Sequence, residues 1–280
     1  MEDPRPTEGQ EVHLLRFDRY DRLLHGLLMA SFLGLSLTGL PLLFAEERWA
    51  LRMARLLGGY GVTGLLHRFF ASLLIACFLF HLARLLHKVY VRKQRGILWG
   101  PDSLVPQPRD VVQMLQHFRW FVGLAPRPRF DRFSYWEKFD YWAVFWGMAI
   151  IGGSGLLLWF PGLFARLLPG WVLNVAFVVH GEEALLAVVF IFTVHFFNCH
   201  LRPEKFPMDT VMFTGRVTLD ELRHERPAEY ERIERSGRIH ALRVLPAPAR
   251  LRRAGYLLGA IAVALGLLMV MLTLYALLSA

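Results

Sequence analysis

The sequence predicts an all-α, multi-pass membrane protein. Its 280 residues are 55% hydrophobic with a mean hydropathy of +0.36, which is too apolar for an ordinary soluble domain. Five apolar stretches reach the roughly 20 residues that an α-helix needs to cross a bilayer. The charged residues gather between these stretches rather than within them.

The five expected spans divide the chain into segments. The spans are expected at about 22–45, 62–88, 138–160, 172–198 and 254–278. The first twenty residues are polar and lack the apolar core of a cleavable signal peptide, so the first span is expected to direct insertion. We therefore expect an N-terminal arm at 1–21 and a four-span core at 22–198 with a loop at 89–137. The charged segment at 199–253 is expected to contain one or two helices capped by Thr218, and a fifth helix at 254–280 is expected to anchor the chain or pack against the core.

The distribution of charge predicts the topology. The net charge is +9, and Lys and Arg crowd into 88–138 and 199–253, whereas the loop between the third and fourth spans holds Arg166 alone. By the positive-inside rule the N-terminus and both basic segments face the cytoplasm, and the C-terminus faces outward. The basic excess thus indicates membrane topology and no nucleic-acid partner.

The two cysteines limit the cofactors that this chain can hold alone. Cys77 and Cys199 are too few for a disulfide framework or for an iron–sulfur cluster, which usually needs four thiolates. No C-x-x-C-H motif for covalent haem attachment occurs, nor a dinucleotide-binding glycine motif after a strand.

Histidines within the spans carry the strongest chemical signal. His67 and His81 lie 14 residues apart in the second span, and His180 and His195 lie 15 apart in the fourth. At 1.5 Å per residue these spacings are about 21 and 22 Å, and 14 residues complete nearly whole turns. Both histidines of a span therefore face broadly one side of the helix, with 15 residues leaving about 60° between them.

Both of these spans enter from the outside, so His67 and His180 share the outer level while His81 and His195 share the inner level. Two imidazole pairs at two depths suit two bis-histidine haems b in a four-helix bundle. Helix–helix hydrogen bonding by isolated histidines is the plain alternative. A histidine-based metal transporter would need imidazoles and acids converging at one depth, and a structural membrane anchor needs no cofactor.

His25 adds an alternative at the inner level. It lies at the cytoplasmic start of the first span, so His25 and His81 compete for the iron that faces His195. The other histidine is expected to contact a haem propionate or quinone, or to hold a third haem with His200. Of the rest, His87 is expected at the interface; His13, His117, His224 and His240 are expected to be solvated.

Several motifs resemble a known family. "RYDRLLHGLLMASFLGLSLTGLPLLF", "LLHRFF", "EKFDYWAVFW" and "RPAEYERI" resemble, in order, segments of membrane cytochrome b subunits of the formate dehydrogenase gamma type, over roughly residues 13–235. "YWEKFDYW", "HGEEALLAVVFIFTVHFFNCHLRPEKFPMD" and "FTGRV" are more similar to a bacterial subgroup associated with multihaem c-type cytochromes.

The resemblance implies a four-helix dihaem core in a bacterial cytoplasmic (inner) membrane that exchanges electrons with quinone. Carried over by motif, His67 pairs with His180 and His25 with His195. The chain departs from the pattern in having His81, a spacing of 15 in the fourth span, and a fifth span. The family therefore favours His25 as the inner ligand, whereas helix geometry favours His81.

Polar residues near the expected haems are candidates for quinone or proton contact. Lys138 aligns with a family pocket at the entry of the third span, where Tyr135 also lies, although its aromatic neighbours equally suit an interfacial belt. Glu182 and Glu183 follow His180 and could accept quinol protons, or simply lie at the outer headgroups.

The sequence thus predicts an electron-transfer subunit between menaquinol or ubiquinol and a partner redox protein. A periplasmic multihaem cytochrome c is the first expectation, and an iron–sulfur or molybdenum subunit of a dehydrogenase or reductase is the second. The direction of electron flow stays open, because haem potentials depend on surrounding contacts.

Overall fold

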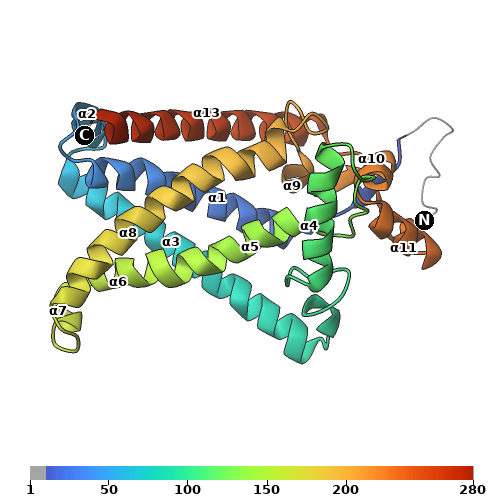
Figure 1. Cartoon of the computed structure of the whole chain (residues 1–280), viewed down its shortest axis with the longest axis horizontal. Coiled ribbons are helices and arrows are strands. Elements are labelled where there is room, and N and C mark those ends of the chain that lie inside the picture. Colours follow the sequence, from blue (N-terminus) through green and yellow to red (C-terminus); the bar gives the residue numbers. More distant parts are fainter. Residues whose placement is uncertain (1–10, 280) are drawn as a thin grey trace. The chain divides into compact units, whose positions relative to one another are not determined.

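The computed structural model describes residues 11–279, so most of the expected N-terminal arm (1–10) and Ala280 lie outside the described residues. The chain is mostly helical (Figure 1). Five helical stretches are long and apolar enough to cross a membrane, which confirms the predicted fold class: Arg19–Leu43, Tyr60–Val91, Tyr135–Trp159, Trp171–Leu201 and Ala249–Ser279.

Three of these stretches contain π-helical turns. The first is α1 (Arg19–Leu43) and the last is α13 (Ala249–Ser279). The second joins α3 (Tyr60–Leu86) to a π turn at His87–Val91. The third comprises α5 (Tyr135–Gly147), a π turn at Met148–Gly152 and α6 (Gly153–Trp159). The fourth comprises α8 (Trp171–Phe190) and π turns at Ile191–His195 and Phe197–Leu201.

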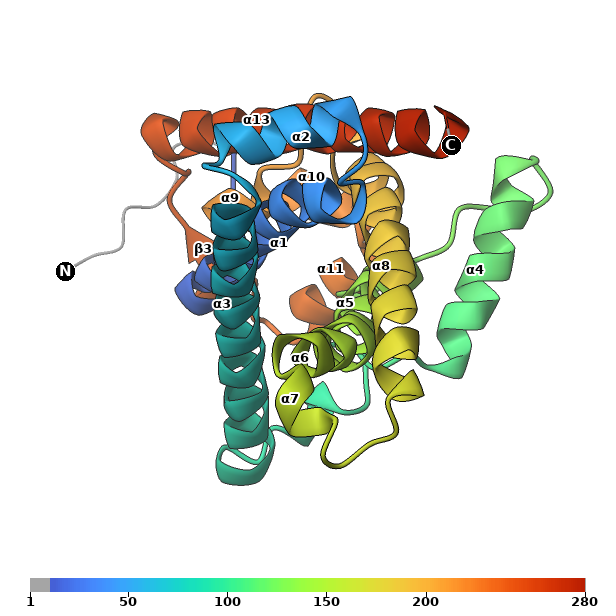
Figure 2. The same ribbon diagram turned by 90° about the vertical axis from the view of Figure 1, so that its left-hand side faces the viewer.

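The chain forms two compact units. We call residues 23–82, 143–209 and 254–279 the bundle unit, and residues 11–22, 83–142 and 210–253 the polar unit. Two short helices, α2 (Arg48–Leu56) and α7 (Pro161–Phe164), belong to the bundle unit. Figure 2 shows its helices α1, α3, α6 and α8 arranged around one another, with α13 beside α1 and α8.

The core of the bundle unit is apolar and joins α1, α8 and α13. Leu40, Phe192 and Met269 are buried together in one cluster. A stripe of small residues lets α13 approach closely: a Cβ on Gly266 would lie 2.6 Å from the Phe192 ring. The fifth span is thus a packing helix of the bundle, one of the two roles expected for it.

The polar unit contains a small sheet that the sequence did not predict. Strands β1 (His13–Leu15), β2 (Arg216–Thr218) and β3 (Arg243–Val244) form an antiparallel sheet in the order β2-β1-β3, with His13 opposite both Thr218 and Val244. Strands of two or three residues are too short for an alternating pattern to show in the sequence.

Short helices complete the polar unit: α4 (Pro108–Phe121), α9 (Val211–Thr214), α10 (Leu219–Glu225), α11 (Pro227–Arg235), α12 (Ile239–Leu242) and a 3-10 turn at Arg95–Ile97. Thr218 caps α10 as expected, because its hydroxyl accepts a hydrogen bond from the Glu221 N–H at 3.1 Å.

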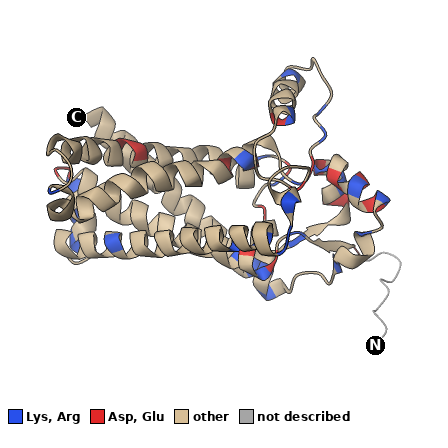
Figure 3. Cartoon of the chain, turned by 90° about the horizontal axis from the view of Figure 1, so that it is seen from below, with Lys and Arg blue, Asp and Glu red and all other residues tan. Residues whose placement is uncertain are grey.

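Buried ion pairs hold the polar unit together, and Figure 3 shows charged residues of both signs along α10 and α11. Glu229 is 2% exposed and accepts from Arg16 at 2.8 Å and from Arg132 at 3.2 Å. Each arginine also donates to the backbone carbonyl of the other. Because a buried carboxylate needs compensating donors, this network ties residues remote in sequence together.

Candidate haem site

Two histidines of the bundle unit face each other across the helices. His67 on α3 and His180 on α8 have ring centroids 6.3 Å apart, with their planes at 80°. An imidazole nitrogen binds a metal ion at about 2.0 Å and lies about 1.1 Å from its ring centre, so two imidazoles on opposite sides of one iron have centroids about 6 Å apart. The separation of these two rings therefore fits a bis-histidine haem.

The hydroxyl of Thr38 on α1 determines which nitrogen of His67 carries the proton. Thr38 Oγ1 lies 3.0 Å from His67 Nδ1 and 2.7 Å from the Gly34 carbonyl oxygen. The hydroxyl has a single proton, and the carbonyl can only accept. Thr38 therefore donates to Gly34 and accepts from His67 Nδ1–H, which leaves the lone pair on Nε2 for a metal.

The same arrangement recurs at His180. Its Nδ1 lies 3.0 Å from the Ile151 carbonyl oxygen and 3.2 Å from Ser154 Oγ, while the Ser154 hydroxyl donates to the Ile150 carbonyl at 2.6 Å. A carbonyl oxygen accepts only, so Nδ1 of His180 also carries the proton. Partners of this kind orient metal-binding histidines and raise their basicity.

A glycine next to each hydroxyl residue gives the imidazole its space. A Cβ on Gly39 would lie 3.0 Å from His67 Cε1, and a Cβ on Gly155 would lie 3.0 Å from His180 Cε1. The same two-residue pattern, a hydroxyl residue followed by a glycine, thus occurs twice, as Thr38-Gly39 on α1 and as Ser154-Gly155 on α6. The two halves of the bundle present the two imidazoles in matching ways.

A second group of histidines gathers elsewhere in the bundle unit. His25 on α1 interacts electrostatically with His195 and His200. The ring of His200 lies 5.9 Å from that of Phe196, and Cys199 Sγ lies 3.8 Å from His195 Nδ1. The ring of His81 has an edge contact with Phe145 at 6.4 Å.

A π turn changes the geometry expected for the fourth span. With regular α-helix over the 15 residues between His180 and His195, the two side chains are expected about 60° apart. The helix instead widens to a π turn at Ile191–His195. A π turn holds more residues than an α turn, so it absorbs the extra residue of the spacing. Such turns are frequent at functional sites.

Lys138 and Tyr135 are engaged within the polar unit. Lys138 is 1% exposed, and its Nζ donates to both carboxylate oxygens of Asp110 at 2.8 Å. The Tyr135 hydroxyl lies 3.1 Å from His117 Nδ1. The expectation that His117 is solvated is wrong: it is 8% exposed and stacks on Phe121 at 4.6 Å, because α4 folds its inner face onto α5.

The two acids after His180 differ in environment. Glu183 is half-buried and accepts a hydrogen bond from Trp146 Nε1 at 3.1 Å, whereas Glu182 is exposed. Glu183 lies three residues after His180 and so shares its helix face. The sequence alone left open which of the two acids turns inward.

The remaining histidines divide by exposure. His224 and His240 are exposed, as expected, and His87, expected at the interface, is exposed as well. The expectation that His13 is solvated is wrong: it is half-buried, because it lies in β1 between β2 and β3. Among residues 11–279, no group of three or more His, Cys, Asp or Glu is placed to hold a metal ion. The convergence that the transporter alternative requires is therefore not seen in the described residues.

Five apolar helices and facing imidazoles with fixed tautomers point to the class of membrane b-type cytochromes. The comparison with family models agrees: the chain belongs to the prokaryotic cytochrome b561 family, whose model matches residues 16–202. It is thus a multi-pass membrane protein that binds b-type haem and transfers electrons. The match covers the first four spans, and α13 lies beyond it. A search of curated proteins found no match.

The residues that orient the histidines were not predicted from the sequence. The available signal was the recurrence of a hydroxyl residue, a glycine and a leucine at 38–40 and 154–156. That pattern is short, and only the fold shows that each copy lies against a histidine of another helix.

Proposed function

We propose that this chain carries electrons between the quinone pool and a partner redox protein through two haems b, one held by His67 and His180 and the other by His25 and His195. The geometry of the first pair carries the proposal: centroids 6.3 Å apart, with each Nδ1 hydrogen-bonded to a neighbouring helix. When bound, each haem supplies a one-electron iron couple.

The choice of His25 over His81 for the second haem rests on two supports. His25 interacts electrostatically with His195. The family resemblance stated above pairs the same two residues. His81 then borders the site. A third haem would require that His25 and His81 both act as ligands, or that His200 acts as one.

Quinol oxidation releases protons as well as electrons, so the pathway needs a group that accepts a proton close to a haem. Glu183 is suited to this role because it shares the His180 face and is held by Trp146. Lys138 and Tyr135 serve less well as quinone contacts, since Asp110 and His117 already bind their polar groups. The exposed Glu182 provides a matched comparison.

Charge and resemblance support a proposal for the partner and the orientation. The basic segments at 88–138 and 199–253 support a cytoplasmic location for the N-terminus and an outward-facing C-terminus in a bacterial inner membrane. Because the chain lacks cysteine clusters, another subunit must supply the second half-reaction. A periplasmic multihaem cytochrome c is the first choice, and a dehydrogenase with iron–sulfur or molybdenum centres is the alternative.

The first test measures the ratio of haem to protein by the pyridine haemochrome spectrum in the purified wild type and in His25→Ala, His81→Ala and His87→Ala. We expect two haems b in the wild type, His81→Ala and His87→Ala, and one in His25→Ala. Loss in His81→Ala alone would assign the second haem to His81. A wild type without haem would overturn the proposal.

The second test follows reduction of the haems by menaquinol and ubiquinol analogues in reconstituted vesicles. Glu183→Gln is expected to slow reduction and Glu182→Gln to leave it unchanged, because only Glu183 shares the His180 face. Equal rates in all three proteins would remove Glu183 from the proton path while leaving haem ligation untouched.

A further inference from the structure

Helix α4 exposes an unusually apolar face. Val111, Leu115, Phe118 and Val122 recur at helical spacing and are 55%, 56%, 58% and 68% exposed. A neighbouring side of the helix is buried through Asp110 and His117. Large apolar patches on a protein surface mark binding partners or membrane contact. Because one side of α4 is buried and its apolar face is exposed, we expect an apolar partner to cover that face.

The position of α4 in the chain brings it next to the membrane. The membrane-spanning stretch that includes α3 ends at Val91, and the next such stretch begins at Tyr135. Helix α4 occupies Pro108–Phe121 between them. Lys138, near the start of that next stretch, binds Asp110 of α4 through the buried ion pair. This contact holds α4 against the start of a stretch that is long and apolar enough to cross a membrane.

The charge of the same segment suits a surface of anionic lipid. Residues 92–134 carry eight Lys or Arg and three Asp or Glu. Arg119 is exposed beside the apolar face of α4. Anionic headgroups attract basic residues next to membrane spans, and amphipathic helices with basic borders lie in the interface with their apolar face buried.

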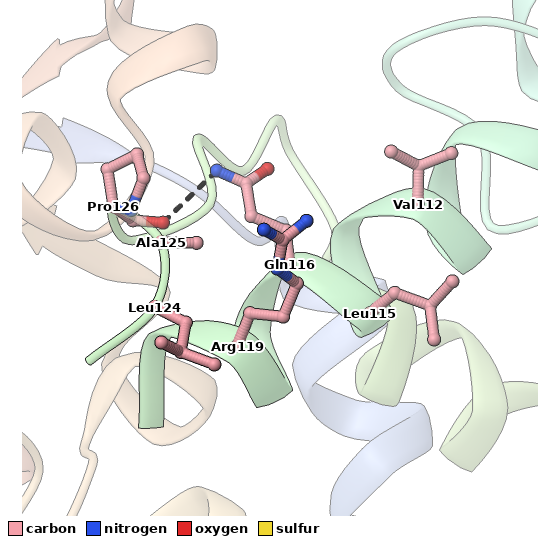
Figure 4. A pocket seen from close by; sticks show the side chains of 7 residues that line it. All are labelled: Val112, Leu115, Gln116, Arg119, Leu124, Ala125 and Pro126. Carbon is pink, nitrogen blue, oxygen red and sulfur yellow. Dashed lines mark hydrogen bonds between the residues drawn. The ribbon is translucent and has the colours of Figure 1, made fainter. Parts of the chain in front are cut away.

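A hollow on this surface adds a place for one lipid. It has a volume of about 490 Å³ and lies between α4 and the loop at 124–126. Figure 4 shows Leu115 and Arg119 on the helix side and Leu124 on the loop side, with the Gln116 amide donating to the Pro126 carbonyl at 3.1 Å. Apolar walls with an arginine at the rim suit an acyl chain whose phosphate binds the guanidinium.

We propose that α4 lies in the lipid interface as an amphipathic helix, with its Val111–Leu115–Phe118 face in the acyl region and Arg119 on the phosphate of an anionic phospholipid. The proposal does not depend on haem ligation. It makes α4 a second, peripheral membrane contact of the polar unit, in addition to the spans.

The test uses the full haem-loaded chain in lipid nanodiscs with a spin label at Leu115→Cys, and at Arg235→Cys on the exposed surface of α11 as the matched control, both in a Cys77→Ala, Cys199→Ala background. Collision with oxygen, which enters lipid, is compared with collision with a water-soluble nickel chelate. In discs containing phosphatidylglycerol, we expect the oxygen-to-nickel ratio to be severalfold higher at 115 than at 235. A label at Phe118→Cys repeats the measurement if the first variant does not fold.

Two outcomes would overturn the proposal. Equal access of the nickel chelate to positions 115 and 235 would mean that α4 lies in water. Protection from both reagents, with broadening between labels, would mean that a second copy or another protein covers the face. Arg119→Gln is expected to lower the equilibrium constant for binding of α4 to the lipid interface about fivefold, as for loss of one basic charge near an anionic surface. In discs of phosphatidylcholine alone, the wild type and Arg119→Gln should behave alike.

Discussion

Replacing Thr38 with valine removes the oxygen that accepts the hydrogen bond from His67 Nδ1 while keeping the branched shape of the side chain. The Nδ1···Oγ1 distance is 3.0 Å, and Thr38 is 2% exposed, so water does not readily replace the lost acceptor. A buried donor left unsatisfied costs about 1–3 kcal/mol. Loss of such a partner to a metal-binding histidine lowers metal affinity about 10- to 100-fold.

The same substitution should change the midpoint potential of the haem bound by His67. The hydrogen bond makes the imidazole more basic, which favours ferric iron, so its loss should raise the potential. If the bond differs by about 1 kcal/mol between the two oxidation states, the shift is on the order of 40 mV for one electron. Ser154→Ala should have a smaller effect, because the Ile151 carbonyl remains 3.0 Å from His180 Nδ1.

The assay combines haem content with spectroelectrochemical titration. Thr38→Ser keeps the hydroxyl and should behave as wild type. Ser36→Ala is the matched control, since Ser36 is also buried on α1 and its hydroxyl donates to the Phe32 carbonyl at 2.9 Å. If Thr38→Val retains both wild-type haem affinity and wild-type potentials, Thr38 does not orient a haem ligand and the reasoning fails.

Further substitutions test packing around the site. Gly39→Val should lower haem content, because its Cβ would lie 3.0 Å from an imidazole carbon, whereas Gly26→Val, with nothing within 4 Å of that Cβ, should retain both haems in the haemochrome assay. Lys138→Met should lower the free energy of unfolding by about 3–5 kcal/mol, because it leaves the Asp110 carboxylate buried and unpaired. Denaturation in detergent measures this free energy, and a Lys138→Met, Asp110→Asn double variant is expected to recover stability. Gly266→Leu should separate α13 from α8 and lower thermal stability, so an unchanged melting temperature would contradict the close packing.

The sequence alone determined the features that depend on composition and local spacing. Five spans follow from apolar length, because any helix in lipid must satisfy its own backbone. The pairing of His67 with His180 follows from depth, because the rise per residue of a helix is constant. The cap at Thr218 follows from a local motif.

The tertiary structure decided everything that depends on contacts between distant segments. It set the acceptors for the two imidazoles, since Thr38 lies 29 residues from His67 and Ser154 lies 26 from His180. It paired Lys138 with Asp110 and left Glu183 half-buried and Glu182 exposed. It also introduced the π turn at Ile191–His195. Spacing in a sequence constrains the face and depth of a side chain, but hydrogen-bond partners and burial arise only when separate helices pack together.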